Sequence, residues 1–310
     1  MSFNLHRNSV ATAVFALLLP ISTFSLAQGG MGGGGGGMTP PPAPAMPTVE
    51  FTDALVQKCA SEWASAFRAG ESVEITESCP WDQVLLTEDA YRINAAAVDM
   101  LDGEVIGYKV TTAGDGSVVG TIKTGMVQAA NQAVNLSAGA GVIAEADIMV
   151  RVSDERINQA TSLEEVVRYV DVMVPFIESS DMMLGEGLGR TKALWTASNG
   201  NARYGVMGDP VPVEPTSDFI ERFGAMQVVV VDDQGQTQKD SSARTNPLNA
   251  VLTVLEEFDA RGLGQRLEVG DLISLGTYGG PIRTVTPGSS LTATYIGLTK
   301  EPIEVTANYE

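Results

Sequence analysis

Histidine is the scarcest residue of this 310-residue chain, and its one copy, His6, lies close to the N-terminus. A Ser-His-Asp triad and a histidine-ligated zinc site both need imidazole groups. Residues 1–27 are expected to be removed as a leader, for the reasons given below, and His6 would leave with them. We therefore expect neither histidine-based catalysis nor a histidine-ligated metal site.

Cysteine is almost as rare, because the chain contains only Cys59 and Cys79. Two thiolates cannot build a four-thiolate metal site. In an oxidising compartment a Cys59–Cys79 disulfide is the expected state, and its short loop would contribute about 3 kcal/mol by restricting the unfolded chain. A redox-active pair is the alternative, but an isolated pair of this kind is far more often structural.

Basic residues are also few, with 19 Lys and Arg against 38 Asp and Glu, and the net charge is −19. Binding to nucleic acid or to an anionic membrane surface depends on clustered Lys and Arg. The composition therefore argues against a nucleic-acid partner and against attachment to anionic lipid.

No apolar run is long enough to span a membrane comfortably, since the run at 11–19 is followed by Pro20 and Ser22. With Arg7 before this run and a small-residue site at 25–27, the segment is typical of a secretory signal peptide. No cysteine follows the cleavage site to carry a lipid. We expect residues 1–27 to be a signal peptide and the mature protein to be exported, periplasmic or secreted, without a membrane anchor.

Composition divides the rest of the chain into three parts. Residues 28–48 are almost entirely Gly, Pro, Met and Ala, which predicts a flexible linker. Residues 49–104 predict a small helical region, with helices at 51–68 and from a capping Thr87 to Leu101. Residues 105–310 alternate strands and turns. The segments expected there are strands at 105–110, 142–150, 227–231, 272–275 and 291–296, and helices at 162–172 and 247–261. This pattern predicts an α+β domain.

A spaced set of carboxylates is the main chemical signal. Glu145 and Asp147 lie two residues apart in the strand expected at 142–150, so both should project from one face. Glu178 follows in an apolar segment, and Lys109 lies upstream in another strand. Three converging carboxylates would form an oxygen-only site for Mg²⁺ or Mn²⁺. An acid pair of this kind on a strand is otherwise most often a solvated face.

Seven segments together resemble the 2-keto-4-pentenoate hydratases and 4-oxalocrotonate decarboxylases of the fumarylacetoacetate hydrolase superfamily. They are residues 86–91, 105–110, 144–148, 174–178, 246–250, 261–262 and 270–277. Each motif is short, and their order and spacing carry the resemblance. It implies a rolled, mostly antiparallel β-structure and a metal-stabilised enolate formed from a small 2-keto or 2-hydroxydienoate acid. Family members often assemble, which is compatible with a homo-oligomer here.

The resemblance also implies roles for particular residues. Glu145, Asp147 and Glu178 match the metal ligands, and Lys109 matches the active-site lysine. A further group would contact the substrate: Asn199, Gly276 and Thr277. The implied activity is that of an exported, metal-dependent hydratase or decarboxylase. The carbon–carbon hydrolases of the superfamily use a histidine, which this chain lacks.

Three departures from the family pattern support an alternative function. Asp147 is shorter than the usual glutamate, Lys123 stands near a position that is often acidic, and residues 179–182 lack the usual basic residue. The alternative is a non-catalytic exported protein that binds a small organic acid on the same scaffold.

Overall fold

A computed structural model describes residues 49–130, 132–243, 245–282 and 285–310. The signal peptide (1–27) and the linker (28–48) lie outside these residues, so both stay predictions. All of these residues belong to one compact unit.

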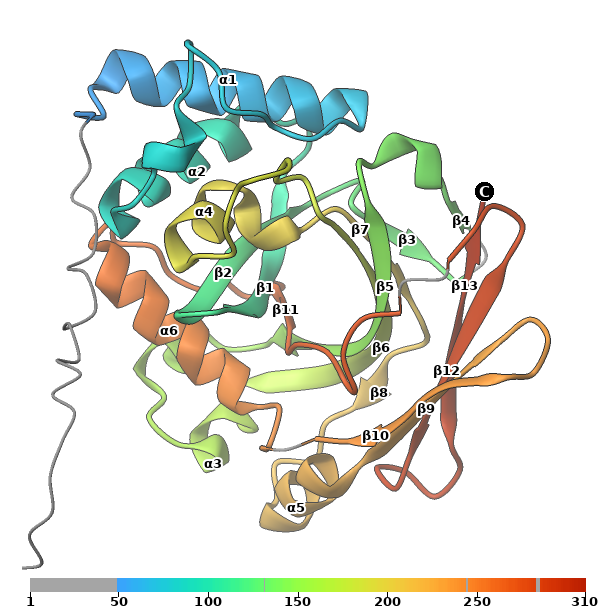
Figure 1. Ribbon diagram of the computed structural model, residues 1–310. Helices are drawn as coiled ribbons and strands as arrows, with labels where there is room; N and C mark the ends of the chain where they lie inside the picture. The colour runs from blue at the N-terminus through green and yellow to red at the C-terminus, as the bar shows by residue number, and fades with distance from the viewer. Residues whose placement is uncertain (1–48, 131, 244, 283–284) are drawn as a thin grey trace, which may run out of the picture. The chain divides into compact units, whose positions relative to one another are not determined.

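Two β-sheets form the centre of this unit (Figure 1). In spatial order the strands of the larger sheet are β2 (Gly116–Lys123), β1 (Val105–Ala113), β11 (Leu272–Ser274), β5 (Val142–Val152), β6 (Val170–Asp181), β7 (Tyr204–Met207) and β3 (Val127–Ala129), with β8 (Val211–Pro212) paired to β6. The smaller sheet has the order β10 (Thr237–Ser242), β9 (Gln227–Asp232), β12 (Ser290–Ile296), β13 (Ile303–Tyr309) and β4 (Ala133–Val134). Most pairs are antiparallel, and the exceptions are β1 with β11, β3 with β7, and β4 with β13. The predicted α+β class with mostly antiparallel strands is confirmed.

Helices surround the sheets, and their bounds follow local signals. They are α1 (Asp53–Ala69), α2 (Thr87–Asp99), α3 (Leu163–Val166), α4 (Lys192–Ala197), α5 (Ser217–Ala225) and α6 (Asn249–Arg261). Thr52 Oγ1 accepts a hydrogen bond from Leu55 N at the start of α1, and Gly70 ends the helix in a left-handed conformation. Thr87 is the first residue of α2 and makes no capping hydrogen bond, so the expected cap at Thr87 is wrong.

The predicted helix at 162–172 is also wrong beyond its first turn. Ser162 caps α3 by accepting from Glu165 N, and the helix ends at Val166. From Val170 the chain enters β6, where Val172 and Val174 alternate with other residues over a long pairing with β5. Because β-branched side chains favour a pleated surface, this pairing overrides the helical spacing of the sequence.

The strand β5 separates two hydrophobic clusters by strict alternation. Ala144, Ala146, Ile148 and Val150 contribute to the larger cluster, which includes the smaller sheet. Met149 faces the other way, into the cluster beneath α1 and α2. Since alternate side chains of a strand share a face, Glu145 and Asp147 lie on the side of Met149.

A tyrosine of the smaller sheet makes hydrogen bonds to the backbone of β5 and β6. The Tyr295 hydroxyl on β12 donates to the carbonyl oxygens of Asp147 and Phe176, at 2.5 and 2.9 Å. Both carbonyls belong to neighbouring strands of the larger sheet. The tyrosine therefore fixes the backbone on which the acidic residues stand.

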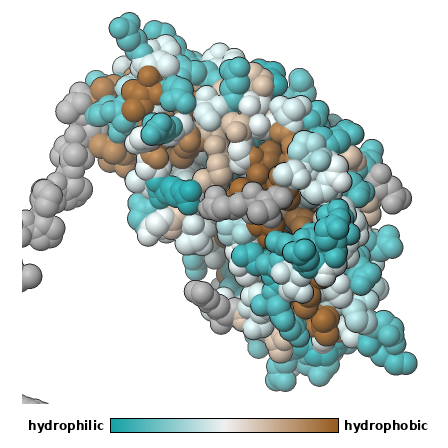
Figure 2. Space-filling model, turned by 45° about the vertical axis from the view of Figure 1, so that its right-hand side comes forward, coloured by the Kyte–Doolittle hydropathy of each residue, from teal (hydrophilic) through white to brown (hydrophobic). Residues whose placement is uncertain are grey.

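The outer surface is mainly hydrophilic where one face of the molecule is seen. Figure 2 shows hydrophilic residues over most of one face, with apolar residues gathered in a few places between them. Among the described residues, no helix has both the length and the apolarity that crossing a membrane requires.

The two cysteines form a disulfide that joins α1 to the loop before α2. Their Cα atoms are 5.0 Å apart, and both residues are fully buried. We expect the Cys59→Ala/Cys79→Ala variant to lose about 3 kcal/mol of unfolding free energy, because the unfolded chain gains the freedom that the cross-link removes. Urea denaturation of both proteins measures this difference, and equal midpoints would contradict it.

Candidate active site

The three predicted ligands occupy neighbouring positions on one face of the larger sheet. Glu145 on β5 and Glu178 on β6 are direct cross-strand partners, and Asp147 follows two residues along β5. Facing residues of an antiparallel pair have Cβ atoms about 5 Å apart. Strand register therefore brings together acids that are far apart in the sequence.

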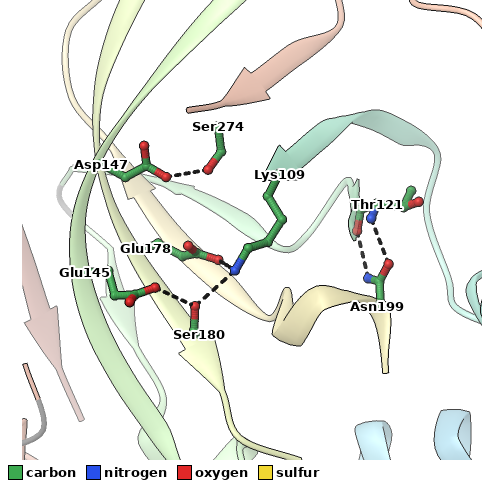
Figure 3. A network of polar contacts seen from close by, with 8 residues as sticks. All are labelled: Lys109, Thr121, Glu145, Asp147, Glu178, Ser180, Asn199 and Ser274. Carbon is green, nitrogen blue, oxygen red and sulfur yellow. Dashed lines mark hydrogen bonds and ion pairs between the residues drawn. The ribbon is translucent and has the colours of Figure 1, made fainter. Parts of the chain in front are cut away.

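Lys109 lies close to these acids because the short strand β11 pairs with both β1 and β5. In register, Lys109 on β1 faces Ser274 on β11, and Ser274 faces Met149 on β5, which shares its face with Asp147. The insertion of β11 between β1 and β5 thus places the lysine beside the acids (Figure 3).

The Lys109 ammonium is buried and contacts two side chains of the site. It pairs with Glu178 Oε1 and donates to Ser180 Oγ at 3.1 Å, and Ser180 Oγ donates to Glu145 Oε2 at 3.1 Å. Lys109 and Glu178 are 2% and 5% exposed, so water screens their pairing little. Removing either partner would leave a buried charge without compensation.

Asp147 is fully buried and has its own partners. Its carboxylate accepts from Ile148 N at 2.5 Å and from the Ser274 hydroxyl. Burial, and after it the negative charge of Glu178, raise the Asp147 pKa from 3.8 to about 7. Asp147 therefore gives up its proton less readily than an exposed aspartate does.

The three carboxylates suit a divalent cation in their chemical type and in their positions on the sheet. Three carboxylates at adjacent register positions are the donor type that Mg²⁺ and Mn²⁺ prefer. Their oxygens do not yet converge, because each carboxylate is turned to another partner, and no group of three acidic or cysteine side chains in the described residues is arranged to hold a metal. The residues fit the ion in kind and position, and binding would exchange their present contacts for metal bonds.

A cavity of about 700 Å³ opens beside the acids. The residues of its wall that matter here are Glu145, Glu178, Arg190, Trp195, Gly276 and Thr277. Two of the predicted ligands and two of the predicted substrate-binding residues thus share this cavity. Gly276 has a φ of 97°, a conformation that favours glycine, so the chain can turn into the cavity directly after β11.

Two residues of the cavity wall, Trp195 and Tyr278, carry buried polar groups without partners in the described part of the chain. These groups are the Trp195 indole N–H and the Tyr278 hydroxyl. Burial raises the Tyr278 pKa well above its ordinary value, so its hydroxyl keeps its proton. Sequence reasoning missed both residues, and it also missed Arg190. Residues 179–182 lack the expected basic residue, and Arg190, further along the chain, supplies one to the cavity wall.

Asn199 lies elsewhere in the structure. Its side-chain amide accepts from Thr121 N at 2.7 Å and donates to Thr121 O at 2.9 Å, and it also accepts from Asn94. Asn199 is fully buried and is not among the described residues that line the cavity. It locks the 3-10 turn after α4 to β2, and its substrate contact stays a prediction that this arrangement does not support.

Lys123 also lies away from the acids. Its ammonium donates to the carbonyl oxygens of Val98 and Leu101, at 3.0 and 2.5 Å. Cations are favoured beside the carbonyls that end a helix, so Lys123 stabilises the C-terminal end of α2. Its departure from the family pattern therefore reflects a structural contact.

Comparison with known proteins found similarity at the level of structure only. No protein-family model matches the sequence, and no curated protein sequence matches it. The 4-oxalocrotonate decarboxylase from Pseudomonas putida G7, complexed with magnesium and adipate, aligns at a TM-score of 0.70 and 17% identity, over 84% of this chain and 99% of that chain. The same enzyme complexed with calcium and acetate aligns at 0.67, with the same identity and coverage.

The TM-scores establish the fold, and an identity of 17% does not by itself transfer the activity. The resemblance drawn from the sequence motifs is confirmed for the fold. The chain has the fold of 4-oxalocrotonate decarboxylase.

Proposed function

We propose that the protein is an exported, divalent-metal-dependent lyase that hydrates or decarboxylates a small 2-keto or 2-hydroxydienoate acid. One observation carries this proposal: Glu145 and Glu178 stand as cross-strand partners on the wall of a 700 Å³ cavity, with Lys109 paired to Glu178. The solved structures with this fold include an enzyme complexed with magnesium or calcium and with organic acids.

Glu145, Asp147 and Glu178 would hold Mg²⁺ or Mn²⁺. A divalent cation at this position would supply positive charge for a substrate oxygen that becomes negative during the reaction. Thr277 and the turn at Gly276, in a segment whose backbone bonds to β5, would contact the substrate from the cavity wall.

Lys109 would then stabilise negative charge on the substrate or donate a proton to it. Once Glu178 is drawn to a cation, the ammonium loses its ion-pair partner and keeps its hydrogen bond to Ser180. A buried ammonium without its carboxylate can stabilise negative charge on the substrate or donate a proton to it. Lys109→Met should therefore retain metal binding and lose turnover.

Arg190 would bind a second acidic group of the substrate. It is the only Lys or Arg among the described residues of the cavity wall, and its guanidinium has no hydrogen-bond or ion-pair partner within the described residues. Arginine recognises carboxylates with paired, charge-assisted hydrogen bonds. The enzyme with the similar fold is named for 4-oxalocrotonate and was solved with adipate, and both are diacids.

We expect Arg190→Gln to weaken diacid binding about 30-fold, which corresponds to about 2 kcal/mol for a hydrogen-bonded charge pair. Binding of a monoacid should be unchanged. Calorimetry with 2-oxoadipate and 2-oxohexanoate in Mg²⁺ measures both, since these acids differ only at the end distant from the keto group. Equal losses for the two acids would contradict the role of Arg190.

The proposal is tested by calorimetry of Mg²⁺ and Mn²⁺ binding with and without oxalate, followed by an ultraviolet assay on 2-hydroxydienoates. Metal binding that strengthens when the acid is present, with turnover of a dienoate, is the expected result. Absence of metal binding in the wild-type protein would overturn it.

The second candidate is a non-catalytic protein that binds a small acid in the same cavity. It is favoured by the engagement of Lys109 with Glu178 and of Asp147 with Ser274, which leaves neither group free in this conformation. Tight binding of 2-keto acids without any product would establish this candidate and exclude the lyase.

A further inference from the structure

The segment that delivers Arg190 to the cavity is a strap formed by residues 182–190, between β6 and α4. It contains Gly185, Gly187 and Gly189 and no regular helix or strand. Such a segment has little internal stiffness of its own, because glycine restricts the backbone least. Its position must come from what it contacts.

The first part of the strap is held by Val73. Val73 N donates to Met183 O at 2.8 Å, and Gly185 N donates back to Val73 O at 3.0 Å. These two bonds make a short parallel bridge between Val73 and Leu184. Val73 and Met183 are both buried, so water does not compete for the bridge.

The far end of the strap meets the β1–β2 turn. Gly114 N donates to Arg190 O at 3.2 Å, and Asp115 Oδ1 accepts from Lys192 N at 2.5 Å. The strap is therefore supported at both ends, and Arg190 lies at the second support.

Val73 itself belongs to a loop, residues 71–79, that the disulfide ties to α1. Cys79 ends this loop, and its backbone N–H donates to Thr76 Oγ1 at 2.9 Å. The Thr76 hydroxyl donates in turn to Glu62 on α1 at 3.0 Å. The side chains of Cys59, Cys79, Val73 and Met183 belong to one hydrophobic cluster.

We propose that the Cys59–Cys79 disulfide is a positioning element for substrate recognition: it holds loop 71–79, which holds the strap, which sets Arg190 in the cavity. This inference rests on the proposed function, because it assigns a purpose to the Arg190 contact. Glu145, Asp147 and Glu178 lie on β5 and β6, whose pairing does not involve the strap. Loss of the disulfide should therefore change diacid recognition and leave metal binding alone.

The test is a double-mutant cycle between Cys59→Ala/Cys79→Ala and Arg190→Gln. Binding of 2-oxoadipate and of 2-oxohexanoate is measured by calorimetry in saturating Mg²⁺, together with the Mg²⁺ affinity alone. We expect the cysteine variant to bind the diacid about tenfold more weakly. We expect its affinities for the monoacid and for Mg²⁺ to match the wild type. In the Arg190→Gln background the cysteine change should have no further effect on the diacid.

Two further variants separate positioning from general destabilisation. Leu291→Ala removes a buried side chain of β12, which costs a few kcal/mol as the disulfide does, and it lies away from the strap. It should leave the diacid preference intact. Thr76→Val keeps the cysteines and removes the hydroxyl that Cys79 N contacts, and it should weaken diacid binding in the same direction. This variant keeps the test informative if the cysteine variant does not fold.

Equal losses for the diacid and the monoacid, or additive effects of the cysteine and Arg190 changes, would overturn the inference. A diacid preference that survives in both the cysteine variant and Thr76→Val would also overturn it. Those results leave the proposed function intact, whereas a wild-type protein that binds no acid with Mg²⁺ would remove the proposed function itself.

Discussion

Glu178→Gln is expected to weaken Mg²⁺ binding more than about 100-fold, because loss of a charged ligand should exceed the 10–100-fold losses known for outer-shell partners. It should also destabilise the protein by about 3 kcal/mol, since Lys109 would remain buried beside a neutral amide. Calorimetry of metal binding and urea denaturation measure the two effects separately.

Glu145→Gln is the matched control for this experiment. Glu145 is less buried than Glu178, it is bonded to the Ser180 hydroxyl, and a glutamine oxygen can accept that same bond. We expect Glu145→Gln to lose metal binding with little change in stability. Wild-type Mg²⁺ affinity in both variants would show that these residues are not ligands, and the lyase proposal would fail with them.

Asp147→Asn is expected to stabilise the metal-free protein at pH 8 by about 2 kcal/mol. The Asp147 pKa is raised from 3.8 to about 7, first by burial and then by Glu178, so folding is opposed when this carboxylate is ionised. A shift of this size corresponds to about 4 kcal/mol at most. The gain is smaller because an amide has one oxygen to serve both Ser274 and Ile148.

The difference in stability between the wild type and Asp147→Asn should depend on pH. A carboxyl group with a raised pKa in the folded state favours folding below its unfolded pKa, and that contribution is lost as the pH rises. The wild type should therefore be about 2 kcal/mol more stable than Asp147→Asn near pH 4, and it should lose this advantage and fall below the variant as the pH rises toward 7. Denaturation midpoints of the metal-free proteins across this range measure the difference.

Addition of Mg²⁺ should reverse the order of stability. The wild type gains the free energy of metal binding in its folded state, and the variant, which lacks the ligand, does not. An Asp147→Asn protein that is less stable at every pH without metal would contradict the buried-charge explanation.

The site shows which contacts a local pattern can predict. Glu145 and Asp147 share a face because alternation along a strand depends on the backbone alone. The pairing of Glu145 with Glu178 depends on the register of β5 and β6, and a shift of one residue would have placed Glu178 on the opposite face. The sequence predicted three ligands as a set, and it could not predict that Lys109 and Ser274 would engage two of them.

The wrong helix prediction and the unexpected contacts of Lys123 and Asn199 also result from long-range contacts. Residues 167–172 have helical spacing, but the chain beyond Val170 pairs with β5, and this long-range pairing overrides local propensity. Lys123 and Asn199 were interpreted by their place in the family pattern. Their partners are backbone groups of α2 and β2, which only tertiary packing brings within reach.

By itself, the sequence determined the α+β class, the strands that carry the acids, and the disulfide, because these depend on local periodicity and on there being only two cysteines. Tertiary structure alone decided that Arg190, Trp195 and Tyr278 line the cavity beside Glu145 and Glu178. The physical reason is that strand periodicity is a property of neighbouring residues. Cavity walls are made by side chains from segments whose approach depends on register, strap placement and packing.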